Sequence, residues 1–197
     1  MARINGLSFY KRRKKINRSH IKEFLSWFLA IAAAIFFALV LNYFFGLSTN
    51  VVGASMEPTL FHEQKVYIDR FSYILGRPKI GDVVVFLPGG NENSHYYCKR
   101  IVALPGDKVL IEDGILYVNG QESTQVTVKI VDGGIAKNEI TLERSEYFCI
   151  GDNVNNSEDS RSTNLGPIHF EDIIGRAWFA MGTQEKSMGL ISRIGAQ

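Results

Sequence analysis

Residues that build disulfide scaffolds or metal sites are scarce in this chain. Of its 197 residues only 2 are cysteine, 4 are histidine and 5 are proline. Two thiols do not make a disulfide framework, although an external compartment would permit one bond between Cys98 and Cys149. No Cys/His spacing resembles a zinc site, and neither a phosphate-cradling glycine loop followed by Lys-Ser/Thr nor a His-Glu-x-x-His pattern occurs. We therefore expect neither a cofactor nor a metal.

Acidic residues are absent from the first 22 positions. Eight basic residues occur there: Arg3, Lys11, Arg12, Arg13, Lys14, Lys15, Arg18 and Lys22. Because the whole chain carries +2, residues 23–197 carry −6. A basic run can be a nucleic-acid-binding tail, but this one lies directly against an apolar span, which favours the positive-inside explanation. Residues 1–23 are predicted to form a basic cytoplasmic N-terminus, held at the inner surface by anionic lipid headgroups.

Charged residues are also absent from residues 24–47, FLSWFLAIAAAIFFALVLNYFFGL. At about 1.5 Å of rise per residue, a helix here reaches roughly 36 Å, enough to cross a hydrocarbon core of about 30 Å. The apolar core of a cleavable signal peptide is shorter, about 7–15 residues, and a buried helix of a soluble protein would show a polar face. The segment is predicted to be a transmembrane helix, with its N-terminus cytoplasmic and the rest of the chain external.

Beyond this span, short alternating or β-branched runs bounded by Gly, Pro and Asn predict strands rather than helices. In residues 108–119 two such runs flank Asp113-Gly114, a pair suited to a type I′ hairpin turn. The other predicted strands are 65–69, 82–86, 96–104, 125–131, 147–150 and 173–181. Residues 48–183 are therefore predicted to form an all-β external domain of antiparallel sheets or a partly closed barrel. The tail, residues 184–197, could be a loose end or a short amphipathic helix.

One serine and one lysine have the surroundings that a serine-lysine mechanism needs. Serine is a weak nucleophile that requires a neighbouring base, and lysine can act as that base only if its site disfavours the charged amine. Ser55 lies in VVGASMEPTL, between Gly53 and the stiffening Pro58. Lys99 lies inside the strand-like run YYCKRIVALPGD, whose half-buried face would lower its pKa. Each signal is weak alone, because most serines in turns and most lysines in strands are structural or solvated.

Four sequence segments, in order, resemble the conserved boxes of bacterial type I signal peptidases. GASMEPTL is similar to the nucleophile box and KRIVALPGDKV to the general-base box. RPKIGDVVVF resembles the box between these two, and GDNVNNSEDSR resembles the last box. Together with the N-terminal span they cover most of residues 24–180.

The resemblance implies a role for each matching position. Ser55 would be the nucleophile, Lys99 the general base, and Ser157 would hydrogen-bond the Lys99 amine. Asp159 with Arg161, and Asp152 with Arg100, would form structural ion pairs near the site. The positions that would line shallow pockets for small substrate side chains at P1 and P3 are Met56, Leu60, Tyr97 and Cys98. For Leu60 in particular, ordinary core packing is an equally good interpretation.

The implied activity is a serine endopeptidase that removes N-terminal signal peptides from exported preproteins after an Ala-x-Ala-like sequence. It would be a single-pass, monomeric protein of the bacterial cytoplasmic membrane, with preproteins and the lipid bilayer as partners and no nucleic acid. One departure matters: Gly53 occupies a position where one branch of the family has a serine that donates to the oxyanion hole. Backbone N–H groups, chiefly that of Ser55, would serve instead.

Three other functions remain as alternatives. A specialised Ser/Lys peptidase, such as one that processes a conjugative pilin, would share the dyad, and substrate range cannot be read from the sequence. A self-cleaving repressor of the LexA type shares the chemistry but would carry a DNA-binding helix-turn-helix where this chain has a membrane span. A catalytically dead single-pass binding module would be expected to have lost Ser55, Lys99 or Ser157.

Overall fold

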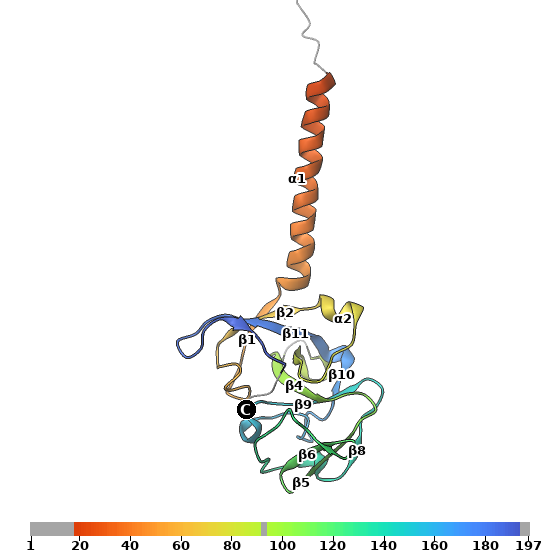
Figure 1. Ribbon diagram of the computed structural model, residues 1–197, viewed down its shortest axis with the longest axis vertical. Coiled ribbons are helices and arrows are strands. Elements are labelled where there is room, and N and C mark those ends of the chain that lie inside the picture. The colour runs from red at the N-terminus through yellow and green to blue at the C-terminus, as the bar shows by residue number, and fades with distance from the viewer. Residues whose placement is uncertain (1–17, 92–93, 194–197) are drawn as a thin grey trace, which may run out of the picture. The chain divides into compact units, whose positions relative to one another are not determined.

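The computed structural model describes residues 18–91 and 94–193, which divide between Val40 and Leu41 into two units. Most of the predicted basic N-terminus lies outside the described residues. Helix α1, Arg18–Phe45, contains the segment Ile21–Phe45, which by length and composition is able to cross a membrane and has no buried residues (Figure 1). The helix ends at Phe45: the N–H of Gly46 still donates to the carbonyl of Asn42 at 2.8 Å, as in a helix, and the chain then becomes extended at β1.

The second unit is built on a sheet of eight antiparallel strands with the order β1-β2-β11-β3-β4-β9-β10, in which β12 also pairs with β11. These strands are β1 Ser48–Asn50, β2 Lys65–Asp69, β3 Val83–Phe86, β4 Tyr97–Ala103, β9 Glu146–Ile150, β10 Ile168–His169, β11 Ile173–Ala180 and β12 Gly189–Leu190. All four residues of β3 are buried, because its two neighbours cover both edges and side chains pack on both faces.

A smaller sheet of four strands has the order β7-β6-β5-β8. Its members are β5 Lys108–Glu112, β6 Ile115–Val118, β7 Gln121–Glu122 and β8 Ile140–Thr141. Asp113 and Gly114 have φ angles of 53° and 82°, so the β5–β6 connection has the positive φ values of the predicted type I′ hairpin. The two sheets confirm the predicted fold class, an all-β domain after one N-terminal apolar helix.

Helical structure in the second unit is short. Over the residues of this unit that the structure describes, it consists of one α-helix, α2, Phe71–Leu75, and four 3-10 turns: Pro88–Gly90, Gly134–Lys137, Val154–Asn156 and Phe170–Asp172. Between these elements the apolar side chains gather into three buried clusters. One cluster combines side chains of the smaller sheet with side chains of β4 and β9, and therefore joins the two sheets. The other two clusters pack against the larger sheet.

Two expectations differ from the structure. Residues 125–131 form no strand: Asn155 hydrogen-bonds the N–H of Val131 and the carbonyl of Lys129 through its side-chain amide, and so replaces a neighbouring strand. The tail is neither loose nor helical over its described residues. It pairs with β11 through β12 and then places Arg193 beside Asp82, at 2.7 Å between Nε and Oδ1.

Candidate active site

Ser55 lies on a tight turn between β1 and β2. The turn begins at Gly53, whose φ of +82° is strained for any residue with a side chain. The Gly53 N–H donates to His62 Nδ1 at 3.0 Å, and the Glu57 N–H donates to the Ala54 carbonyl at 3.2 Å. These bonds fix the backbone on both sides of Ser55 and present its hydroxyl to the neighbouring strand.

Lys99 is the third residue of β4, and its side chain is almost completely buried, with 3% of the residue exposed. It lies opposite Val84 of β3 in the antiparallel register, and Val84 is fully buried. The ring of Tyr97 lies 5.7 Å from the Lys99 amine, and the buried thiol of Cys98 is adjacent in the chain. Most of the Lys99 stem therefore packs among apolar groups.

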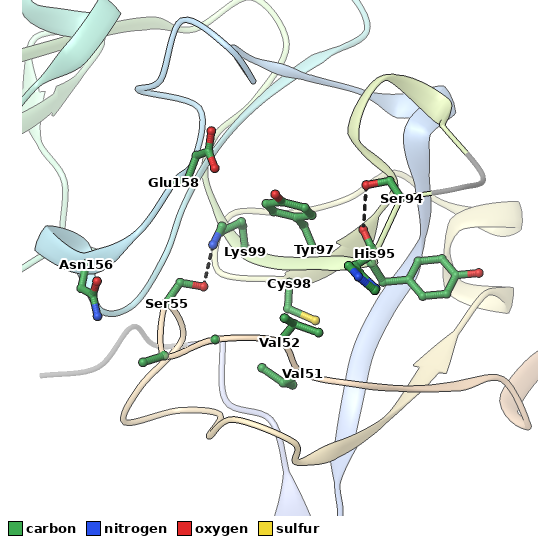
Figure 2. Close-up of a pocket in the computed structure, with 13 residues that line it drawn as sticks. Val51, Val52, Ser55, Ser94, His95, Tyr97, Cys98, Lys99, Asn156 and Glu158 are labelled. Carbon is green, nitrogen blue, oxygen red and sulfur yellow. Dashed lines mark hydrogen bonds between the residues drawn. The ribbon is translucent and has the colours of Figure 1, made fainter.

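The two residues meet although they are 44 positions apart in the sequence: Lys99 Nζ and Ser55 Oγ are 2.6 Å apart (Figure 2). Burial lowers the pKa of Lys99 from its ordinary value, because the charged amine loses hydration there. The carboxylate of Asp159 is the strongest influence in the opposite direction. An amine that releases its proton more readily, at hydrogen-bonding distance from a hydroxyl, is the arrangement expected of a base beside a nucleophile.

A loop that begins at Gly151 supports the turn that carries Ser55. The backbone N–H of Asn153 donates to the Ser55 carbonyl at 3.0 Å, and its side-chain Nδ2 donates to the Ala54 carbonyl at 3.1 Å. A Cβ atom on Gly151 would lie 2.4 Å from the Ser55 carbonyl oxygen, so only glycine allows this approach. Within the described part of the chain the Ser55 N–H donates no hydrogen bond, which leaves it available to an oxyanion.

Two buried ion pairs hold this loop in place. Arg100 donates from Nε and NH2 to the two carboxylate oxygens of Asp152, each at 2.7 Å, and its NH1 donates to the carbonyls of Gly81 and Ser192. Arg161 binds Asp159 with Nε and NH2 at 2.8 Å. The four side chains expected to pair do so. In this bidentate geometry two hydrogen bonds join each guanidinium group to its carboxylate, which offsets the loss of hydration of the buried charges.

Ser157 lies on the same loop, but the expected hydrogen bond to Lys99 is not made. Its Oγ is buried and has no hydrogen-bond partner among the residues that the structure describes. The neighbouring residues Asn156 and Glu158 both line the same cavity as Lys99. Ser157 is thus a buried hydroxyl close to the site with unused hydrogen-bonding capacity.

A cavity of about 320 Å³ opens beside Ser55 and Lys99. Tyr97 and Cys98 line it, as expected. Met56 and Leu60 do not: both are fully buried in the cluster that also contains Val66 and Ile68, so they pack the core instead. Sequence reasoning missed several residues that do line the cavity: Val51, Val52, Ser94, His95, Tyr96, Asn156 and Glu158.

The two cysteines are both free and both buried. Cys98 packs in one cluster with Val85, whereas Cys149 packs in another with Phe86 and Ile101. A disulfide between them is therefore not formed. Among residues 18–91 and 94–193 no group of three or more His, Cys, Asp or Glu side chains is placed to hold a metal ion.

Comparison with known proteins identifies relatives over most of the chain. Residues 24–181 match the family described as signal peptidase, peptidase S26. Signal peptidase I P of Bacillus subtilis subsp. natto is 31% identical over 174 residues, which are 84% of this chain and 89% of that protein. Signal peptidase I of Bacillus licheniformis is 33% identical over 166 residues, 78% of this chain and 86% of that protein. Signal peptidase IB of Staphylococcus aureus is 30% identical over 176 residues, 80% and 89% of the two chains.

A crystal structure of a signal peptidase I from Enterococcus faecalis V583 aligns with 51% of this chain and 97% of that chain, at 24% identity and a TM-score of 0.39. The sequence relatives each extend over at least 78% of this chain, and the family match spans both the N-terminal apolar helix and the β-domain. The chain therefore belongs to the signal peptidase family, peptidase S26, and is a serine peptidase of that family.

Proposed function

We propose that this protein is a membrane-bound endopeptidase that removes signal peptides from exported preproteins after small residues, with Ser55 as nucleophile and Lys99 as general base. The observation that carries the proposal is the 2.6 Å contact between Lys99 Nζ and Ser55 Oγ in a desolvated site. No histidine is needed to activate the serine, because the amine itself lies at hydrogen-bonding distance from the hydroxyl.

The reaction would proceed in two halves. The neutral Lys99 amine accepts the Ser55 proton as Oγ attacks the scissile carbonyl, and the resulting ammonium gives that proton to the leaving amine when the carbon–nitrogen bond breaks. The signal peptide is then an ester of Ser55. Lys99 next takes a proton from water, the hydroxide attacks the ester, and the proton returns to Ser55 as the peptide leaves.

Two further groups assist in this proposal. The Ser55 N–H, which donates to no described residue, stabilises the oxyanion of each tetrahedral intermediate. Ser157 orients the Lys99 amine: its buried hydroxyl lies on the loop beside the site and has no hydrogen-bond partner in the described structure. Asp152 and Asp159 act indirectly, through the ion pairs that keep the loop rigid.

The cavity favours small side chains before the cleaved bond. Its wall next to Ser55 is formed by Val51, Val52 and the Tyr97-Cys98 pair, which would limit the size of a substrate side chain placed there. A preprotein would bind in extended form along the segment 51–54, whose Val52 side chain is 57% exposed. Cleavage after an Ala-x-Ala-like sequence is the specificity expected of a cavity whose wall is formed by these side chains.

The membrane assignment rests on the apolar helix and on charge. Residues 24–47 would span the bilayer, with residues 1–23 cytoplasmic because eight of their nine charged side chains are positive, Glu23 being the exception. Ser55 follows Leu47 by eight residues, a distance of at most roughly 30 Å even when fully extended. The tether would keep a monomeric enzyme near the membrane surface, where the apolar segment of a preprotein ends.

The proposal is tested by cleavage of a preprotein carrying an Ala-x-Ala site with the detergent-solubilised full chain. Wild type should cut after the second alanine, whereas Ser55→Ala and Lys99→Ala should be folded and inactive. A Lys99→Ala protein that retains the wild-type rate would refute the general base. A wild type that cuts no signal peptide but processes one dedicated substrate would favour the specialised peptidase.

The orientation has its own test. In spheroplasts of a bacterium expressing the full chain with a short epitope at the N-terminus, added protease should degrade the β-domain and leave the epitope protected. Protection of the β-domain and loss of the epitope would reverse the proposed topology.

A further inference from the structure

Glu158 places a negative charge at one end of the catalytic cavity. It lines the same cavity as Ser55 and Lys99, and its side chain is exposed. Figure 2 shows Glu158 and Asn156 on one side of the Ser55–Lys99 pair, and Ser94 and His95 on the other. A peptide whose scissile carbonyl reaches Ser55 must therefore pass Glu158 with one of its two ends.

Glu158 differs from the other acidic residues of its loop. Asp152 and Asp159 are each held by an arginine at 2.7–2.8 Å. Glu158, in contrast, forms no hydrogen bond or ion pair with any residue in the described ranges. Among the described residues that line the cavity it is also the one with an acidic side chain. Its carboxylate is free to bind a cation supplied by the substrate.

The position of the apolar side chains in the cavity indicates which part of a bound substrate lies beside Glu158. In the proposed function, small residues before the scissile bond lie against Val51, Tyr97 and Cys98. These side chains lie on the side of the Ser55–Lys99 pair that is away from Glu158 (Figure 2). The residues that follow the scissile bond, which become the N-terminus of the mature protein, must then leave past Asn156 and Glu158.

We propose that Glu158 forms a subsite for a lysine or arginine side chain in the first three residues after the scissile bond. This inference rests on the proposed function and adds to it a preference for basic residues after the scissile bond. The cation would pair with a carboxylate at the rim of the cavity, where water is partly displaced, so the preference should be modest and should weaken as salt is added.

An alternative role for Glu158 would be to act on the Lys99 amine through its charge. Asp159 exerts a larger influence on that amine than Glu158 does. Loss of such an influence would alter the pH dependence for every substrate equally, because Lys99 takes part in every turnover. Loss of a subsite, in contrast, would change the ratio of kcat/KM between substrates that differ in charge, and this difference separates the two roles.

The test uses the full chain in detergent and preproteins that are identical except for one position. Lys, Gln or Glu is placed in turn at the first, second or third residue after an Ala-x-Ala site, and kcat/KM is measured for wild type, Glu158→Gln and Glu158→Lys. At one of these positions wild type should prefer Lys over Glu by about three- to tenfold at low salt. The ratio should fall to about one in Glu158→Gln and invert in Glu158→Lys. Glu112→Gln, at an exposed position of β5 in the smaller sheet, should keep the wild-type ratio.

Lys-to-Glu ratios that are the same in all four proteins at all three positions would overturn the subsite. The Gln substrates keep this result distinct from a failure of the proposed function. If wild type does not cut them, or if Ser55→Ala cuts them as fast, the proposed function fails; if they are cut normally and the ratios do not move, only the role of Glu158 fails.

Discussion

The amine of Lys99 lies in a largely buried part of the molecule. Packed opposite Val84 and beside Cys98, the residue is 3% exposed, and this burial lowers its pKa below the ordinary lysine value of about 10.4. Below that ordinary value the unfolded chain binds the proton more tightly than the folded chain does, so the buried amine disfavours folding. A residue retained against stability is typical of a functional site.

Replacement of this amine by an apolar group of similar length should therefore stabilise the protein. Lys99→Met is expected to raise the Tm at pH 7 by about 3 °C while abolishing cleavage. The gain should shrink as the pH rises from the lowered pKa of Lys99 toward about 10.4, because the folded wild type then holds the neutral amine at no disadvantage. Thermal unfolding measured between pH 7 and pH 10 follows both effects.

The matched control is Lys108→Met, since the Lys108 side chain is 57% exposed and paired with Glu139 on the surface. It should give no comparable gain at any pH. A Lys99→Met protein less stable than wild type at pH 7 would contradict the account of Lys99.

Sequence reasoning found the two proposed catalytic residues but not all of their surroundings. Ser55 and Lys99 lie in distinctive flanking segments. Nothing in the local sequence separates an apolar residue that lines a cavity from one that fills the core, so the sequence assigns Met56 to the substrate pocket and leaves Leu60 undecided between pocket and core. The pair Glu158-Asp159 is different: the family resemblance implies that Arg161 pairs with Asp159, which the structure shows, but the exposure of Glu158 beside the cavity is known only from the fold.

At the scale of elements, the central relation is between the turn that carries Ser55 and the loop that begins at Gly151. Asn153 reaches two consecutive carbonyls of the turn, one from its backbone and one from its side chain. These bonds orient the Ser55 peptide unit, and with it both the hydroxyl and the N–H that would face an oxyanion. Asn153 is therefore a positioning residue for the proposed nucleophile.

Loss of the Asn153 side chain should mainly affect turnover. Asn153→Ala removes one hydrogen bond, worth about 1 kcal/mol, and should lower kcat by about five- to tenfold with little change in KM. Preprotein cleavage at several substrate concentrations separates the two constants.

Asn155→Ala provides the comparison on the same loop, because Asn155 also makes two hydrogen bonds but directs them to residues 129 and 131. It should reduce stability and leave kcat near the wild-type value. Equal losses of kcat in the two variants would indicate that the loop acts only as a structural support.

Among the elements, strands with clear alternation were predictable. The runs at residues 65–69 and 108–119 gave a strand and a hairpin because two-residue periodicity and a Gly-containing turn define them locally. Residues 125–131 have the same alternation, yet backbone groups at 129 and 131 bond the Asn155 side chain instead of a neighbouring strand. Asn155 is more than twenty residues away, so this tertiary contact cannot be predicted from the sequence of the segment alone.

At the scale of the whole β-domain, the C-terminal tail ties distant parts together. After β12 it places Arg193 on the buried carboxylate of Asp82, and the Ser192 carbonyl accepts a hydrogen bond from Arg100, the neighbour of Lys99. The tail was not predictable, because its strand is two residues long and has no periodicity. Its anchor is a side chain whose partner is more than a hundred residues away.

Removal of this anchor should destabilise the domain. Arg193→Ala leaves Asp82, which is 1% exposed, with one guanidinium contact fewer and should lower the free energy of unfolding by about 1–2 kcal/mol. Lys137→Ala, which breaks an exposed ion pair with Asp132, should lower it by clearly less, because water screens that pair. Denaturant unfolding compares the two, and equal losses would argue against the tail as a structural anchor.

The account as a whole depends on the identity of the general base, and the pH dependence of kcat/KM tests it most directly. Because the neutral amine of Lys99 is the active form, cleavage should rise with pH along one limb that lies below the ordinary lysine pKa of about 10.4. His95, which lines the same cavity, provides the competing base, and His95→Gln should leave the limb where it is. A limb centred near the ordinary histidine value of about 6.5 that disappears in His95→Gln would contradict the serine-lysine mechanism.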